Sequence, residues 1–220
     1  MYFCVTNDKN KKTITIMTHS AKDVSRWFDE NNVPFKPVTT LNWAKDFPYR
    51  PEFTFRLART EDALLLNYRV KESAVRGVEA VDNGSVWEDD CVECFIKAPE
   101  SDVYYNIECN CVGTLLIGCG EGRAYRLRYT PSILSQVSRI STLGNEPIGT
   151  LNEETEWELS LIVPFSLLPE LHDDGKRTDY IGNIYKCGDK QPTPHFVTRF
   201  PINTPSPDYH RPEFFQPLWE

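Results

Sequence analysis

Carboxylate and amide side chains alternate with apolar residues along two consecutive segments of the sequence, 91–96 and 104–111. In an extended chain successive side chains point to opposite faces, so Glu93 lies on the face opposite the apolar residues of its segment. The second segment places a polar row on one face, and this row consists of Asn106, Glu108 and Asn110. If residues 97–103 connect a hairpin, Glu93 and the polar row share one sheet face, with Trp87 at its rim. Carboxylates and amides bond hydroxyl groups, and an indole stacks on apolar C–H faces, so this set suits a sugar. A solvated outer face with a half-buried Trp87 is the alternative interpretation.

The acidic residues of the same region allow two further kinds of site. Glu93 and Glu108, on adjacent strands, could supply the carboxylate pair of a glycoside hydrolase. Nothing in the sequence singles out either acid for a raised pKa, so binding is favoured over catalysis. Calcium, which prefers oxygen ligands, is an open alternative for the run from Glu88 to Asp90 together with loop carbonyls.

Seven cysteines stand at irregular spacing, at 4, 91, 94, 109, 111, 119 and 187. The pairs Cys91-x-x-Cys94 and Cys109-x-Cys111 resemble zinc ligands on paper. Positions three apart on a strand lie on opposite faces, however, so Cys91 and Cys94 cannot hold one ion. The odd number argues against a disulfide framework and predicts buried, reduced thiols. With no visible signal peptide, the sequence favours a cytoplasmic protein; a leader missing from the sequence would instead indicate a secreted or periplasmic one.

The elements that must position these residues are mostly strands. Period-two alternation and apolar runs predict strands at 13–17, 53–57, 63–70, 91–96, 104–111, 113–117, 125–129, 137–141 and 157–163. Helical spacing is confined to residues 20–30, with Ser20 as the N-cap, and to one turn at 166–171. Many short strands without βαβ alternation predict an all-β fold, an antiparallel β-sandwich with one or two short helices. No repeat or linker divides the chain, so residues 1–220 are predicted to form a single domain. The proline-rich stretch 192–220 is expected to wrap this sandwich as irregular chain.

Composition excludes several classes of partner. The formal net charge of −8 leaves no basic excess to neutralise phosphates, which argues against nucleic acid and anionic membranes as partners. No apolar run is long enough to span a membrane. A neutral ligand is compatible with this charge, and the oligomeric state is not specified by the sequence.

Several strings of this sequence resemble one known family. Residues 86–96, VWEDDCVECFI, resemble the W-x-D-x-x-V-E-x-F signature of family 9-like carbohydrate-binding modules. Residues 104–114, YYNIECNCVGT, are similar to that group's Y-Y-N-F-E-F-N-x-x-G-T block. The later strings at 182–189, 194–196 and 208–215 also match, so the resemblance covers the chain from about Trp43 onward.

The resemblance implies a DOMON-like, immunoglobulin-like or jelly-roll type of β-sandwich and non-catalytic binding of a mono- or oligosaccharide. By this resemblance Trp87 corresponds to a stacking tryptophan and Glu93 to a hydroxyl-bonding glutamate. A second tryptophan often follows the family's P-H-F element, and here Arg199 stands at or beside that position. A clamp formed by Trp87 with Arg199 or Phe200 is therefore expected, and His210 is a further candidate ligand residue. The remaining alternative is a structural or protein-interaction sandwich that has lost sugar binding.

Overall fold

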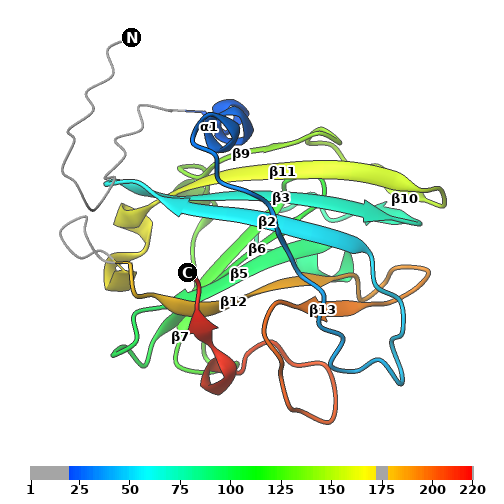
Figure 1. Cartoon of the computed structure of the whole chain (residues 1–220). Coiled ribbons are helices and arrows are strands. Elements are labelled where there is room, and N and C mark those ends of the chain that lie inside the picture. Colours follow the sequence, from blue (N-terminus) through cyan, green and yellow to red (C-terminus); the bar gives the residue numbers. More distant parts are fainter. Residues whose placement is uncertain (1–19, 172–177, 220) are drawn as a thin grey trace.

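The protein is built from two antiparallel sheets that face each other (Figure 1). The computed structural model describes residues 20–171 and 178–219. One sheet has five strands, in the order β1 (Lys36–Pro37), β2 (Glu52–Arg59), β3 (Ala63–Glu72), β11 (Thr155–Pro164) and β9 (Ser138–Ser141). A two-stranded ribbon of β4 (Val75–Gly77) and β10 (Gly149–Leu151) is separate from it.

The second sheet has seven strands and contains both segments with alternating polar residues. Its order is β13 (Phe196–Thr198), β12 (Ile181–Cys187), β5 (Cys91–Lys97), β6 (Tyr104–Asn110), β7 (Leu115–Gly120) and β8 (Leu127–Arg128), and β14 (Gln216–Pro217) also pairs with β12. Strands β5 and β6 form the predicted hairpin, with Glu93 directly opposite Glu108 and Phe95 opposite Asn106.

The main core lies between the two sheets and is made of alternate residues from each strand. On β5 these are Val92, Cys94 and Ile96, which pack with Ile107 and Cys109 of β6. The same periodicity turns Glu93 and Glu108 to the opposite side of the sheet. The face assignment made from the sequence is therefore correct for both strands.

The outer faces of both sheets are partly covered. The short helix α1 (Val24–Glu30) lies over the five-stranded sheet, where Val24 and Phe28 pack on Leu65 and Ile162 (Figure 1). The C-terminal segment runs below the seven-stranded sheet in Figure 1 and contributes Ile202, Tyr209 and Phe215 to a second apolar cluster. The proline-rich segment thus covers part of the polar face of the seven-stranded sheet.

The remaining helical segments are short. Helix α2 spans Pro131–Leu134, and 3-10 turns span Ala21–Asp23, Val86–Glu88, Phe165–Leu167, Pro169–Leu171 and Pro212–Phe214. In the described part of the chain, no helix has the length and apolar character needed to cross a membrane.

The predicted all-β sandwich is confirmed, and most predicted strands are present within a few residues of their expected ends. The strand predicted at 13–17 lies outside the described residues. Strand β12 was not predicted, although it is paired with β5, β13 and β14. Its apolar pattern is interrupted by Gly182, Asn183 and Lys186. Gly182 passes so close to β5 that an added Cβ would lie 2.0 Å from the Phe95 carbonyl oxygen.

Candidate functional site

A pocket of about 380 Å³ opens on the outer face of the seven-stranded sheet. Its floor is formed by two rows of residues that the strand register places side by side. One row contains Glu93, Glu108 and Leu116, from β5, β6 and β7. The next row contains Phe95, Asn106 and Gly118 from the same three strands. Each row of the floor thus combines polar and apolar residues.

The walls of the pocket come from segments outside the central strands. Trp87 is supplied by the 3-10 turn that precedes β5, and the C-terminal segment supplies residues 207–210. The strand β8 and the loop before it contribute three arginines. These are Arg123, Arg126 and Arg128, and the other wall residues are Cys187, Asp189 and Phe196.

The two glutamates of the floor are almost completely buried, with exposed fractions of 3% for Glu93 and 5% for Glu108. Burial raises the pKa of Glu93 well above its usual range, and the adjacent charge of Glu108 raises it further. Burial likewise raises the pKa of Glu108 to about 7, although the amide of Asn106 opposes this shift. A carboxyl group that lines a pocket is suited to bonding a ligand hydroxyl that displaces water.

Trp87 lies in the 3-10 turn Val86–Glu88, which Asp89 directly follows. The Asp89 carboxylate accepts hydrogen bonds from the backbone N–H groups of Val78 and Glu79, at 2.9 and 2.8 Å, which fixes the loop beside the 3-10 turn. The indole itself is half-buried, and the guanidinium of Arg128 lies 5.9 Å from its ring centroid. Trp87 is therefore a partly exposed aromatic surface next to a loop that a buried aspartate fixes.

Asn106 and His210 also line the pocket, with different amounts of free hydrogen-bonding capacity. The Asn106 amide donates to Glu108 (2.8 Å) and accepts from Arg126 (2.9 and 2.7 Å), so it orients Glu108. The Nδ1 of His210 pairs with the Tyr104 hydroxyl at 2.8 Å, and its Nε2 bonds none of the described residues. Burial lowers the pKa of His210 to about 3, so the ring is neutral near pH 7.

Two predicted ligand residues do not line this pocket. Asn110 is fully buried: its amide donates to the Glu79 carbonyl and to Asp89, and its oxygen accepts from the N–H groups of Val112 and Thr114. These four contacts use all the hydrogen bonds that an amide can make, so Asn110 fixes a turn instead of facing the pocket.

Arg199, the second of these residues, points to the other side of the sheet. Its guanidinium lies 5.1 Å from the Phe55 ring centroid and 4.5 Å from that of Phe200, and it donates to the Leu218 carbonyl. Neither Arg199 nor Phe200 lines the pocket, so the expected clamp with Trp87 is not formed.

The acidic run 88–90 has three separate sets of partners. Glu88 pairs with Lys190, Asp89 bonds backbone amides and Asp90 pairs with the buried Lys186. The groups of described residues that could hold a metal include only Asp90 from this run, so the calcium alternative has no shared ligand set there. The interpretation of Cys91 and Cys94 is confirmed, because they lie in apolar clusters on opposite faces of the sheet.

The comparisons with known proteins agree with this geometry. The model of carbohydrate-binding family 9 matches residues 22–219. The chain belongs to carbohydrate-binding family 9. A search of curated protein sequences gives no match.

Several solved structures resemble this family 9 chain, and two of them come from named bacteria. One is a candidate carbohydrate-binding protein from Bacteroides uniformis, with 42% identity over 91% of this chain and 93% of that one, and a TM-score of 0.85. The other is a family 9 module from Caldicellulosiruptor kristjanssonii solved with glucose. It has 12% identity over 84% of this chain and 83% of that one, and a TM-score of 0.52, which supports the shared fold.

Several pocket residues of this family 9 chain were not predicted. Arg126 and Arg128 alternate with the exposed Leu127, a period-two pattern that places both arginines on one strand face. This signal was available in the sequence and could have indicated them. Cys187 and Asp189 depend on β12, so no local pattern pointed to their position beside Glu93.

Proposed function

We propose that this pocket binds the end of a carbohydrate chain or a free monosaccharide without cleaving it. The observation that carries the proposal is the half-buried Trp87 standing beside the buried pair Glu93 and Glu108 in a family 9 chain. A pyranose needs an apolar platform for its C–H face and polar groups for its hydroxyls, and this pocket offers both within 380 Å³.

The polar groups have distinct parts in this proposal. Glu93 and Glu108 accept hydrogen bonds from hydroxyl groups, and the Nε2 of His210 provides a further bonding position. Asn106 and Arg126 bond each other and hold Glu108 in place, so they contribute through positioning. Affinity per site is expected to be modest, because a small polar ligand gains little beyond the cost of removing its water.

The absence of the Trp87–Arg199 clamp leaves the second stacking surface to other residues. Phe196 lines the same pocket and is fixed by edge contacts with Trp43 and Phe47, with ring centroids 6.3 and 4.8 Å away. We propose Phe196 as the apolar wall that replaces the usual second indole.

The experiment that tests the proposal is a glycan-array screen followed by isothermal calorimetry on the hits. Glucose and glucose oligomers are the first probes, because the Caldicellulosiruptor module was solved with glucose. Trp87→Ala should weaken binding by roughly tenfold or more, since loss of an aromatic platform costs about 1.5 kcal/mol. Trp27→Ala is the matched control, because Trp27 is also half-buried but packs by α1 on the other sheet. Equal affinities for wild type and Trp87→Ala would contradict this placement of the site.

The glycoside hydrolase is retained as a second candidate because of one specific observation. Glu93 and Glu108 are cross-strand neighbours in a pocket, and the pKa of Glu108 is raised to about 7, the range in which an acid catalyst can hold its proton. The family consists of non-catalytic modules, so turnover of a chromogenic glycoside would distinguish a hydrolase from a binding module.

A further inference from the structure

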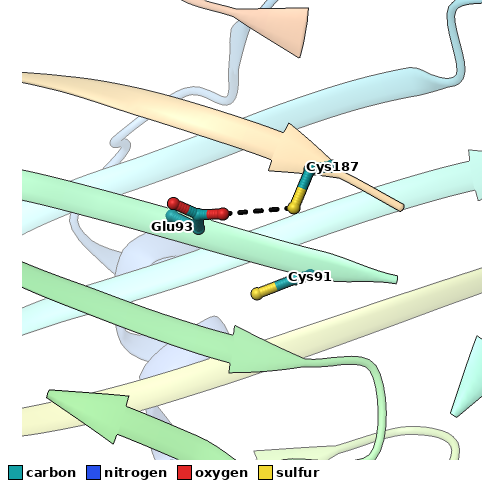
Figure 2. A group of neighbouring side chains, drawn as sticks. All are labelled: Cys91, Glu93 and Cys187. Atoms are coloured by element: carbon teal, nitrogen blue, oxygen red, sulfur yellow. Dashed lines mark hydrogen bonds between the residues drawn. The ribbon is translucent and has the colours of Figure 1, made fainter. Parts of the chain in front are cut away.

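A compact group of metal-ligand side chains lies next to the pocket floor. Cys91 and Glu93 are two residues apart on β5, and Cys187 of β12 is the register partner of Cys91. Figure 2 shows the two sulfur atoms and the carboxylate close together along β5 and the adjoining end of β12. Their ligand atoms all lie within 4.8 Å of one another, and the Cys187 thiol donates to Glu93 at 3.1 Å.

This arrangement follows from strand geometry and differs from the zinc pattern considered from the sequence. Residues two apart on a strand share a face, and register partners on adjacent antiparallel strands have Cβ atoms about 4.5–5.5 Å apart. Cys91, Glu93 and Cys187 therefore converge because β12 pairs with β5. Cys94 lies in the core on the other face and is no part of the group.

A second buried group of potential metal-ligand side chains contains a positively charged side chain, which the first group lacks. Glu72, Asp90 and His195 also lie within 4.8 Å of one another, but the ammonium of Lys186 is inserted among them. It lies 2.5 Å from Asp90, 3.1 Å from Glu72 and 2.7 Å from the Nε2 of His195. That group already holds its cation.

The group of Cys91, Glu93 and Cys187 has no such internal cation. Within the described part of the chain, Glu93 bonds the Cys187 thiol and forms no ion pair. Cys91, Glu93 and Cys187 are all buried, with exposed fractions of 3% or less. Burying charged acids is costly unless a cation compensates them, which a metal ion would do.

We propose that Cys91, Glu93 and Cys187 bind a zinc-class divalent metal ion at the base of the pocket. Thiolates select soft or borderline ions such as Zn²⁺ over Ca²⁺ or Mg²⁺, and a carboxylate oxygen completes three of the four positions that Zn²⁺ prefers. Ligand atoms around a tetrahedral Zn²⁺ lie roughly 3.3–3.8 Å apart. The distance of 3.1 Å between the Cys187 sulfur and Glu93 is close to this spacing, and all three ligand atoms lie within 4.8 Å of one another.

The fourth position of the ion faces the pocket. Glu93 and Cys187 line the pocket, whereas Cys91 lies behind them. A water molecule or another solute oxygen in the pocket completes the coordination. The Cys187 thiol also contacts the Trp87 carbonyl at 3.5 Å, which joins the metal group to the segment that carries the indole. Ion uptake needs no sugar, so this inference goes beyond the proposed function and fails or succeeds independently of it.

The experiment is a Co²⁺ titration of the full chain, reduced and freed of metal under anaerobic conditions. Wild type should bind one Co²⁺ per chain with an ultraviolet thiolate-to-cobalt charge-transfer band, and Zn²⁺ should displace it. Uptake should release the thiol protons into a weakly buffered solution. Cys91→Ser, Cys187→Ser and Glu93→Gln should each weaken binding by more than the roughly 10–100-fold that loss of an outer-shell partner costs.

Two controls and one direct measurement keep the test decisive. Cys119→Ser removes a half-buried thiol elsewhere on the sheet, and Cys4→Ser removes one outside the described residues; both should bind Co²⁺ like wild type. Far-ultraviolet circular dichroism checks the fold of each variant. If a cysteine variant fails to fold, X-ray absorption at the zinc edge of wild type still decides, because it should report two sulfur neighbours.

Three kinds of result would overturn the proposal. The first is the lack of a stoichiometric cobalt band in wild type. The second is a zinc spectrum without sulfur neighbours, or unchanged metal binding in folded Cys91→Ser and Cys187→Ser. The third is a Cys91–Cys187 disulfide that forms on mild oxidation equally fast with and without saturating Zn²⁺, because bound thiolates would be protected.

Discussion

Lys186 of β12 and Asp90, which directly precedes β5, form an ion pair of 2.5 Å with both side chains fully buried. Glu72 approaches the same ammonium from the opposite sheet, and its other oxygen accepts from the Trp157 indole at 2.7 Å. Burial alone would lower the pKa of Lys186, but the charges of Asp90 and Glu72 raise it, so the side chain is charged. The two sheets are therefore joined through a compensated charge as well as through apolar packing.

Replacing Lys186 by methionine should destabilise the protein strongly. The substitution keeps the apolar chain but leaves Asp90 and Glu72 buried without their cation, and breaking a buried ion pair costs about 3–5 kcal/mol. The free energy of unfolding in urea measures this loss. Lys190→Met is the control, because Lys190 pairs with Glu88 at the surface, where loss of an ion pair costs about 1 kcal/mol or less. Similar losses of unfolding free energy in the two variants would contradict the conclusion that the buried Lys186 ion pairs stabilise the fold.

The acid sensitivity of the fold should depend on His195. Burial, helped by the charge of Lys186, lowers the pKa of His195 to about 3 in the folded state. An unfolded histidine takes up a proton near pH 6.5, so this residue's contribution is present above about pH 6.5 and is lost as pH falls towards 3. Between pH 6.5 and 5, the free energy of unfolding of wild type should therefore fall more steeply than that of His195→Gln. The difference in slope should be up to about 1.4 kcal/mol per pH unit. Urea unfolding of both proteins at these pH values measures the difference, and equal pH slopes would count against this account.

Most strands, and the sheet face on which their residues lie, could be predicted from the sequence. This is because the alternation of polar and apolar residues along a strand depends only on residues close in sequence. Glu93, Asn106 and Glu108 were placed on the correct face and lie together in the pocket. Strand β12 was not predicted, because Lys186 interrupts its apolar pattern. The burial of that lysine is stabilised by Asp90 and Glu72, which are distant in sequence, so no local pattern indicates it.

The two predicted residues outside the pocket show a different limit. The sequence placed Asn110 on the polar strand face correctly, but it gave no sign of the loop carrying Glu79 that covers this side chain. Arg199 was selected by its position after a family string, and a position along the chain does not specify which sheet face the side chain occupies. Alternation predicts faces, whereas burial depends on tertiary contacts.

Arg199→Ala should leave sugar affinity unchanged within about twofold. The Arg199 side chain packs on Phe55 and Phe200 away from the pocket, so its loss should cost about 1 kcal/mol of stability through the lost cation–π contact and hydrogen bond. Arg128→Ala is the comparison, because Arg128 lies over Trp87 in the pocket and its loss should weaken binding. Calorimetry with the best sugar ligand measures the affinity of both variants. A larger loss of affinity in Arg199→Ala than in Arg128→Ala would support the clamp of Trp87 with Arg199.

Asn110→Ala should lower stability and not the affinity of the folded protein. The substitution removes the acceptor of the buried Val112 and Thr114 N–H groups and one of the hydrogen bonds to the Asp89 carboxylate. Each buried group left unsatisfied costs about 1–3 kcal/mol. Thermal unfolding and calorimetry separate the two effects. Asn145→Ala, in an exposed loop, is the matched control and should change neither. A weakened sugar affinity in a fully folded Asn110→Ala protein would place this residue back in the site.

The protein should release no product from chromogenic glycosides. Glu93 and Glu108 rise from one sheet face as cross-strand neighbours, so a sugar on that floor meets both carboxyl groups from the same side. Glycosidases place their two carboxyl groups so that they flank the scissile bond. Incubation with a panel of nitrophenyl glycosides tests this, with Glu93→Gln and Glu108→Gln as paired variants and Glu153→Gln, an exposed acid, as the control. Turnover that disappears in both pocket variants and persists in Glu153→Gln would show that the pocket is a hydrolase site, and would replace binding as its function.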